Sequence, residues 1–291
     1  MKIFSGSSNP ALAQKIAGKL NLKLSELEIH IFPDGEKRIR VTDEVVEEDV
    51  ILIQSTSIPV DQNYIELFLI LDALKRSGAR SITLVAPYLG YQRQDHIFRD
   101  GEEVGFKMMA DILENLKVDK LITFDLHSIK LPEFFKIPVV HLTALDLFAE
   151  KIDKDSILVS PDMGGIRRIK HLSQNSGLSF ATIEKNRDLK TGKVQSEKID
   201  GDVQNKNTAI VDDMISTGET IEAAVELLKK NGAGKISVFA THAVFADGAE
   251  KLLSKLPVEQ VVVTDTIDIP QEKRFPKLEI LSVADLIYKN L

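Results

Sequence analysis

Short apolar runs rich in β-branched residues alternate along the chain with longer stretches in which apolar residues recur at helical spacing. We expect strands at 49–54, 81–86, 119–125, 157–160, 179–183, 207–212, 235–240 and 259–264. These runs are continuously apolar, which is typical of parallel strands covered on both faces. Strands that alternate with helices imply α/β layers with right-handed crossovers.

Three of the intervening helices have recognisable ends. Asn9 and Pro10 precede ALAQKIAGKL, which puts proline at the first helical position. Pro59 opens a second helix that stops at Gly78, a glycine expected to cap its C-terminus. A third helix is expected from Thr217, ended by Gly232.

The two halves of the chain repeat one pattern. Strand 49–54, its helix and strand 81–86 match strand 207–212, its helix and strand 235–240, and LITFDLH is echoed by VVVTDTI. The predicted fold class is therefore α/β, with two similar domains, each a mostly parallel sheet flanked by helices. We expect an N-terminal domain at 1–143, with the tail 283–291 packed on it, and a C-terminal domain at 144–282.

Composition and charge narrow the function classes. The 291 residues include no cysteine, so disulfides, thiolate metal sites and cysteine nucleophiles are excluded. A net charge of −7 argues against non-specific electrostatic binding of nucleic acid. The first residues lack the pattern of a secretory signal, and Glu66 and Asp72 interrupt the longest apolar run, so we expect no membrane span and a cytoplasmic protein.

The most informative stretch is TAIVDDMISTGET at 208–220. Strand 207–212 ends in Asp212 and Asp213, and a Ser/Thr/Gly turn then leads into a helix. Ligands of open parallel sheets bind at the carboxyl ends of strands, and a helix N-terminus favours an anion such as phosphate. Adjacent carboxylates suit the hydroxyls of a sugar. The stretch therefore predicts a sugar-phosphate site, with simple capping of the turn by the two acids as the alternative.

VDDMISTGET resembles the 5-phosphoribosyl-pyrophosphate loop of type I phosphoribosyltransferases and ribose-phosphate diphosphokinases. The other motifs separate these two groups. FPDGE (32–36), YQRQD (91–95), DLH (125–127), PDMGG (161–165) and EKNR (184–187) occur in the order seen in ribose-phosphate diphosphokinases. The resemblance covers essentially the whole chain. It implies the type I phosphoribosyltransferase fold in both domains.

The resemblance also implies a reaction. The family transfers the diphosphoryl group of MgATP to the anomeric hydroxyl of ribose 5-phosphate and releases AMP, which requires cations near the phosphates. Lys185 and Arg187 match the catalytic basic pair of the family; without it they could be solvated surface charges. They begin the polar stretch 185–206, which is either a surface hairpin or a mobile active-site loop.

The resemblance assigns the remaining site residues. His127 and Asp162 match positions that contact Mg²⁺, although imidazole is an unusual ligand for so hard a cation. The ATP side comprises Phe32, Asp34, Gly35, Glu36, Arg93 and Gln94. The ribose 5-phosphate side comprises Arg187, Asp212, Asp213, Ser216, Thr217, Gly218, Glu219 and Thr220. Read alone, FPDGE is only a turn signature.

Two further expectations follow from the family. Its adenine motif commonly serves a neighbouring subunit, which implies a homo-oligomer of at least two chains. His96 replaces a common arginine, and IFRDGEEVG replaces a run rich in Ser, Arg and Pro, which indicates the archaeal branch. Two other functions stay open: a phosphoribosyltransferase that consumes the activated sugar, and a catalytically silent regulatory subunit.

Overall fold

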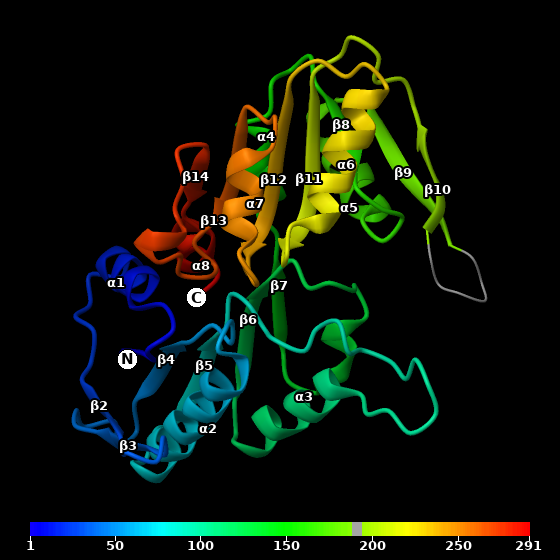
Figure 1. Cartoon of the computed structure of the whole chain (residues 1–291). Helices are drawn as coiled ribbons and strands as arrows, with labels where there is room; N and C mark the ends of the chain where they lie inside the picture. Colours follow the sequence, from blue (N-terminus) through cyan, green and yellow to red (C-terminus); the bar gives the residue numbers. More distant parts are fainter. Residues whose placement is uncertain (188–193) are drawn as a thin grey trace. The chain divides into compact units, whose positions relative to one another are not determined.

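The computed structural model describes residues 1–187 and 194–291, with the side chains of 185–187 and 194–197 outside the described part. The chain folds into two compact units, coloured from blue to red along the sequence in Figure 1. Unit 1 comprises 1–143, 266–268 and 282–291, and unit 2 comprises 144–265 and 269–281. None of the described helices is long and apolar enough to cross a membrane.

Unit 1 is built on a five-stranded sheet of order β1-β4-β5-β6-β7, in which every pairing is parallel. Its strands are β1 (Lys2–Ser5), β4 (Asp49–Ile53), β5 (Ser81–Val85), β6 (Lys120–Phe124) and β7 (Val139–Leu142). The three central strands confirm the predictions at 49–54, 81–86 and 119–125. The edge strands β1 and β7 were not predicted.

The helices of unit 1 are α1 (Pro10–Lys19), α2 (Val60–Arg76), α3 (Gly105–Asn115), the 3₁₀ turn η1 (Leu131–Phe134) and α8 (Ala284–Tyr288). Two of them, α1 and α2, begin and end near the predicted signals. The Asn9 side chain accepts a hydrogen bond from Leu12 N at 3.2 Å and so caps α1. Gly78 follows the last turn of α2 with φ +90°, as a terminating glycine should.

A second, two-stranded antiparallel sheet lies in unit 1, formed by β2 (Leu27–Ile31) and β3 (Lys37–Val41). These strands were not predicted, because both are half-exposed and polar residues alternate with apolar ones. FPDGE forms the turn between them: Gly35 N donates to Phe32 O at 2.9 Å and Phe32 N to Glu36 O at 2.8 Å. Gly35 has φ +93°, a backbone conformation that favours glycine.

Unit 2 contains a seven-stranded sheet of order β10-β9-β8-β11-β12-β13-β14. Its strands are β8 (Ile157–Ser160), β9 (Phe180–Arg187), β10 (Val194–Asp200), β11 (Thr208–Ile215), β12 (Ile236–Ala243), β13 (Gln260–Thr264) and β14 (Leu278–Leu281). All five strands predicted in this half are confirmed, whereas β10 and β14 were missed. β10 alone is antiparallel, and its pairing with β9 makes the stretch after 184 a hairpin. The alternatives for 185–206 were a surface hairpin and a mobile loop, and residues 188–193 of this stretch lie outside the described residues.

Helices cover both faces of the unit 2 sheet, as Figure 1 shows. They are α4 (Leu145–Ala149), α5 (Ile166–Ser176), α6 (Glu219–Lys230), α7 (Ala249–Lys255) and the turn η2 (Gln271–Lys273). Alternate strand residues face opposite ways: Leu158 and Val211 pack with α4 and α5, and Val159 and Ile210 with α6 and α7. Burial on both faces explains why these strands read as unbroken apolar runs.

The two units repeat one plan, element for element. β1-α1-β2-β3-β4-α2-β5-α3-β6-η1-β7-α4 is followed by β8-α5-β9-β10-β11-α6-β12-α7-β13-η2-β14-α8. Both sheets share the order first, fourth, fifth, sixth and seventh strand. The last helix of each repeat is exchanged: α4 packs on α5 in unit 2, and α8 packs on α1 in unit 1. The repeated plan is what the sequence echo between the two halves predicts.

Candidate active site

Within unit 2, one edge of the sheet gathers three of the predicted motifs. β9, β8 and β11 are neighbouring parallel strands, so their carboxyl ends lie at the same edge. β8 leads directly into PDMGG, and the acids of VDDMISTGET lie beyond the last residue of β11 that pairs with β8, Ile210. The pairing of β9 with β8 ends at Thr182. β9 itself continues to Arg187, so the backbone of Lys185 and Arg187 lies beyond the paired part of the strand.

Asp212 and Asp213 lie within a strand and not after its end. The predicted strand 207–212 runs on to Ile215, because β11 keeps pairing with β12 as far as Ala243. Asp213 is 3% exposed, and the side chain of Asp212 is 14% exposed. Asp213 N donates a hydrogen bond to Asp212 Oδ1 at 2.9 Å, so the two acids are also connected through the backbone.

Arg168 on α5 contacts both acids, and sequence reasoning did not identify it. Its Nη1 lies 3.1 Å from Asp212 Oδ1, and its Nη2 lies 3.3 Å from Asp213 Oδ1. Burial raises the pKa of Asp212 well above the usual value of a carboxyl, and Asp213 adds to the shift, whereas the Arg168 guanidinium opposes it. The acids therefore form a buried pair held by one cation, which is more than the capping of a turn.

The turn after β11 leads into α6 with a glycine in the left-handed region. Gly218 has φ +87°, and α6 begins at Glu219, two residues later than predicted, because Thr217 precedes this bend. No side chain caps the N-terminus of α6. Its first N–H groups and the helix dipole therefore suit an anion. Ser216 and Thr217 are half-buried, while Glu219 and Thr220 are exposed.

The PDMGG turn packs closely at the end of β8. Ser160 Oγ donates to the carbonyl of Asp162 at 2.7 Å, and Gly165 N donates to Asp162 Oδ1 at 3.2 Å. A Cβ added at Gly165 would lie 2.5 Å from Ser160 Oγ and 3.2 Å from Arg168 Nη1. The glycine thus leaves space for the arginine that holds the two acids.

Within unit 1, the residues after β5 and β6 meet at one edge. Gln92 is 1% exposed, and its Oε1 accepts a hydrogen bond of 2.8 Å from His127 N. Leu126 N donates to His141 Nε2 at 2.9 Å. Burial lowers the pKa of His141, against the influence of Asp125, so the ring is suited to accept as a neutral group. The DLH segment is thus held by Gln92 and His141, neither of which the sequence singled out.

Arg93 and Gln94 follow Gln92 and are both exposed. Gln94 lies against the start of α3, where a Cβ added at Gly105 would come 2.6 Å from its Oε1. The structure brings Arg93 and Gln94 to the same edge as His127. No hydrogen bond or ion pair joins Asp34 or Glu36 to these three residues in the part of the chain that is described.

The hairpin residues lie on the separate β2–β3 sheet. Arg38 covers the Phe32 ring, with its guanidinium carbon 5.6 Å from the ring centroid, and His30 meets the same ring edge-on at 4.7 Å. A pocket of about 370 Å³ opens between the hairpin, at Gly35 and Glu36, and α2, at Asp61 and Ile65. The predicted ATP residues of the hairpin are therefore accessible.

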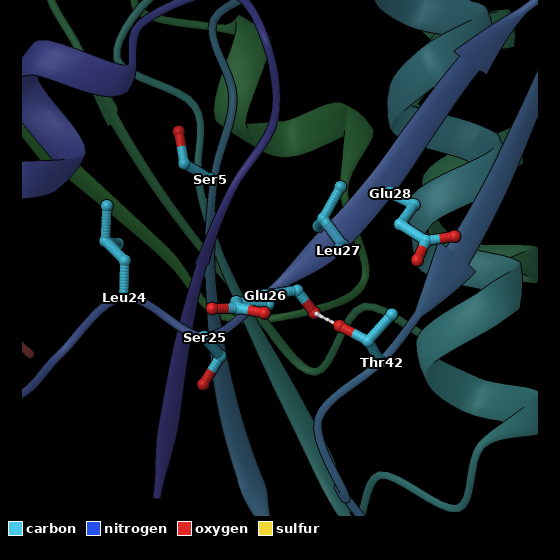
Figure 2. A pocket seen from close by; sticks show the side chains of 7 residues that line it. All are labelled: Ser5, Leu24, Ser25, Glu26, Leu27, Glu28 and Thr42. Atoms are coloured by element: carbon cyan, nitrogen blue, oxygen red, sulfur yellow. Dashed lines mark hydrogen bonds between the residues drawn. The ribbon is translucent and has the colours of Figure 1, made fainter.

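Figure 2 shows another pocket of unit 1, with a volume of about 340 Å³. Its polar lining includes Ser25, Glu26, Glu28 and Thr42, and Thr42 Oγ1 donates to Glu26 O at 2.9 Å. Two carboxylates and no basic side chain line it. The pocket is therefore unsuited to a phosphorylated substrate and contains none of the predicted site residues.

The donor set fits a magnesium ion that arrives with a nucleotide. Among the described residues no group of three or more His, Asp and Glu side chains could hold a metal. Mg²⁺ typically keeps several waters and is bound through one or two carboxylates and substrate phosphates. Asp162, just after β8, is the carboxylate that the sequence analysis predicts for this role. His127 is exposed, and its imidazole is a weaker match to a hard cation.

Comparison with known proteins identifies the family. Residues 1–116 match the model for the N-terminal domain of ribose phosphate pyrophosphokinase, and 164–291 match that of the phosphoribosyl synthetase-associated domain. The ribose-phosphate pyrophosphokinase of Fusobacterium nucleatum is 39% identical over 296 residues, covering 100% of this chain and 93% of its own. The chain belongs to the ribose-phosphate pyrophosphokinase family.

Other members of the ribose-phosphate pyrophosphokinase family agree over the full chain. The Aquifex aeolicus enzyme is 39% identical, covering 99% of this chain and 93% of its own. The crystal structure of phosphoribosylpyrophosphate synthetase from Mycobacterium smegmatis superimposes with a TM-score of 0.93 at 34% identity, covering 99% and 96% of the two chains. The predicted family and fold class are confirmed. These relatives are bacterial, and the likeness to archaeal members stays a prediction.

Proposed function

We propose that this chain is a ribose-phosphate pyrophosphokinase, which transfers the diphosphoryl group of ATP to the anomeric hydroxyl of ribose 5-phosphate. The products are 5-phosphoribosyl 1-diphosphate and AMP. The observation that carries the proposal is the edge of the unit 2 sheet, where a buried acid pair, an uncapped helix N-terminus and the PDMGG turn lie together. Full-length family membership supports the same reaction.

Ribose 5-phosphate binds at that edge. Asp212 and Asp213 accept hydrogen bonds from the sugar hydroxyls, because a carboxylate can take two donors. Ser216, Thr217, Gly218, Glu219 and Thr220 bind the 5-phosphate at the start of α6, mainly through backbone N–H groups. Arg187 adds positive charge near the sugar phosphate.

ATP binds through residues of unit 1. Phe32 offers an aromatic face to the adenine, and Asp34, Gly35 and Glu36 supply acceptors and backbone for its amino group. Arg93 and Gln94 contact the phosphates. The family resemblance assigns His127 of unit 1 and Asp162 of unit 2 each to Mg²⁺, which neutralises phosphate charge when it is bound.

Lys185 and Arg187 are the proposed catalytic pair. Phosphoryl transfer needs positioning and compensation of negative charge more than it needs covalent chemistry. An ammonium and a guanidinium supply that compensation around the transferred phosphorus.

The proposal extends to assembly and compartment. The ATP residues of the β2–β3 hairpin serve a neighbouring subunit, so the enzyme works as a homo-oligomer of at least two chains. Their placement on a separate sheet, without a bond to Arg93 or His127 among the described residues, supports this. The two phosphoribosyltransferase-like domains are 1–143 with 283–291, and 144–282. The absence of cysteine supports a cytoplasmic location.

Product analysis tests the reaction. The purified chain is incubated with ribose 5-phosphate and MgATP, and AMP is separated from ADP by ion-exchange chromatography. AMP in equal amount to the sugar diphosphate, formed only when ribose 5-phosphate is present, is the expected result. ADP would indicate an ordinary kinase. No product here, together with release of diphosphate from 5-phosphoribosyl 1-diphosphate and an added base, would indicate a phosphoribosyltransferase.

A further inference from the structure

In unit 2, the guanidinium of Arg168 on α5 contacts both Asp212 and Asp213 on β11. Arg168 lies in the first turn of α5, and its side chain is 13% exposed. Nη1 donates to Asp212 Oδ1 at 3.1 Å, and Nη2 lies 3.3 Å from Asp213 Oδ1. Each terminal nitrogen thus contacts a different carboxylate, and the two carboxylates are fixed relative to each other.

Two adjacent, largely buried carboxylates need such a partner. Like charges this close repel strongly where water is scarce, and an unpaired buried charge is costly. A planar guanidinium offers parallel donors in a fixed fork, which a lysine ammonium cannot reproduce. Asp212 Oδ1 accepts hydrogen bonds from both Arg168 Nη1 and Asp213 N.

Gly165 lies close to the Arg168 guanidinium. Gly165 has φ −81°, an ordinary helical value, so backbone conformation does not require glycine there. The requirement is steric, because a Cβ would lie 2.5 Å from Ser160 Oγ and 3.2 Å from Arg168 Nη1. Gly165 belongs to PDMGG, and the acids belong to VDDMISTGET. Arg168 therefore connects the two motifs physically.

We propose that Arg168 is a positioning residue for ribose 5-phosphate: its guanidinium fork holds the Asp212 and Asp213 carboxylates in the orientation that accepts the sugar hydroxyls. The inference rests on the proposed function, since it assigns these acids to the sugar. Arg168 acts through the acids and has no contact of its own with the reacting phosphorus. Its loss affects the sugar and not the nucleotide.

Steady-state kinetics of three variants test this. Arg168→Met removes the fork but keeps much of the volume. Arg168→Lys keeps the charge without the fork, and Arg167→Met makes the same change at the exposed neighbouring residue. We expect Arg168→Met to raise KM for ribose 5-phosphate about 10- to 100-fold, as loss of supporting contacts to ligand-binding groups does. KM for ATP should stay within about twofold, Arg168→Lys should fall between, and Arg167→Met should match the wild type.

The results separate this inference from the proposed function. If the wild type forms no AMP from ATP and ribose 5-phosphate, the proposed function fails, whatever Arg168 does. If the wild type forms AMP and Arg168→Met keeps the wild-type KM for ribose 5-phosphate, the inference is wrong. Equal increases in both KM values, or a fall in kcat alone, would indicate a merely structural role. If Arg168→Met does not fold, Arg168→Lys decides, because an unchanged sugar KM in that variant overturns the proposal.

Discussion

The ammonium of Lys37 donates a hydrogen bond of 2.6 Å to Glu66 Oε2, and Glu66 is 1% exposed. The same carboxylate accepts from Ser7 N at 2.7 Å, from Ser7 Oγ at 2.8 Å and from Gln54 Nε2 at 3.1 Å. Lys37 directly follows Glu36, whereas Glu66 lies on α2. A buried ion pair therefore fastens the hairpin that carries the proposed ATP residues.

Lys37→Met should weaken this attachment. The variant leaves Glu66 with neutral donors only, and loss of a hydrogen bond to a buried charged group lowers the free energy of unfolding by about 1–3 kcal/mol. KM for ATP should rise, and KM for ribose 5-phosphate should stay near the wild-type value. Urea unfolding measures the change in stability, and initial rates measure the two KM values.

Arg40→Met is the matched control for Lys37→Met. It removes an exposed ion pair with Glu28 on the same hairpin and should change the free energy of unfolding by less than about 1 kcal/mol. Equal destabilisation in both variants would contradict the role of the buried pair.

The contribution of this pair should depend on pH. Burial raises the pKa of Glu66, but hydrogen bonds from Lys37 and Ser7 outweigh it, so the pKa is lowered below its ordinary value of 4.5. The folded state then binds a proton less readily than the unfolded chain, and the stabilisation is present above pH 4.5 and lost as the pH falls through the folded pKa. The difference in unfolding free energy between wild type and Lys37→Met should therefore be largest near neutral pH and shrink in acid. A difference that grows in acid would mean that Glu66 is not ionised in the folded protein.

Sequence reasoning found the elements that have local signals. Gly78 and Gly232 were predicted to end helices, and both have positive φ values. The Lys37–Glu66 and Arg168–Asp212 pairs join residues that are 29 and 44 positions apart, and only the folded arrangement brings them together. No spacing rule predicts such contacts, because the two residues of each pair lie on different elements of the fold.

The β2–β3 hairpin shows that a motif can be recognised while the strands around it are missed. FPDGE was correctly read as a turn. Its flanking strands were missed, because LEIHI and KRIRV mix charged with apolar residues and are half-exposed. The Gln92–His127 contact was missed although both residues stand in quoted motifs. Motifs therefore indicate which residues belong to the site, whereas the hydrogen bonds that orient these residues are seen only in the folded structure.

Replacement of Lys185 by alanine tests the proposed catalytic pair. Removal of one preorganised donor to a transition state lowers kcat by about 10²–10³-fold. KM for both substrates should change much less, because the charge acts on the transferred group. Lys198→Ala is the control, since Lys198 is exposed on β10 of the same hairpin. Single-turnover measurements of AMP formation give the rate of the chemical step. If the Lys185→Ala variant kept the wild-type kcat, Lys185 would not be a catalytic residue.

Gly218→Ala tests the loop that is proposed to bind the 5-phosphate. At φ +87° an alanine is strained by about 1–2 kcal/mol, and its Cβ would also lie 3.2 Å from the Leu252 side chain. Gly177→Ala is matched, because Gly177 has φ +75° in the same unit but no neighbour within 4 Å. Both variants should unfold at a lower temperature, and only Gly218→Ala should raise KM for ribose 5-phosphate. An unchanged KM in a folded Gly218→Ala protein would place the phosphate elsewhere.

Gly165→Ala separates two consequences of a single added methyl group. The Cβ would meet Ser160 Oγ at 2.5 Å, a clash that lowers stability, and Arg168 Nη1 at 3.2 Å, a contact that shifts the guanidinium by tenths of an ångström. A shift of that size should raise KM for ribose 5-phosphate about 3- to 10-fold, since misplacement by about 1 Å lowers rates about 100-fold. Adding Ser160→Ala removes the clash, so thermal stability should recover, whereas Arg168 stays displaced and KM should stay high. Ser160→Ala alone is the control for the lost bond to the Asp162 carbonyl. If KM returned to the wild-type value together with stability, the guanidinium would not be the group through which Gly165 acts.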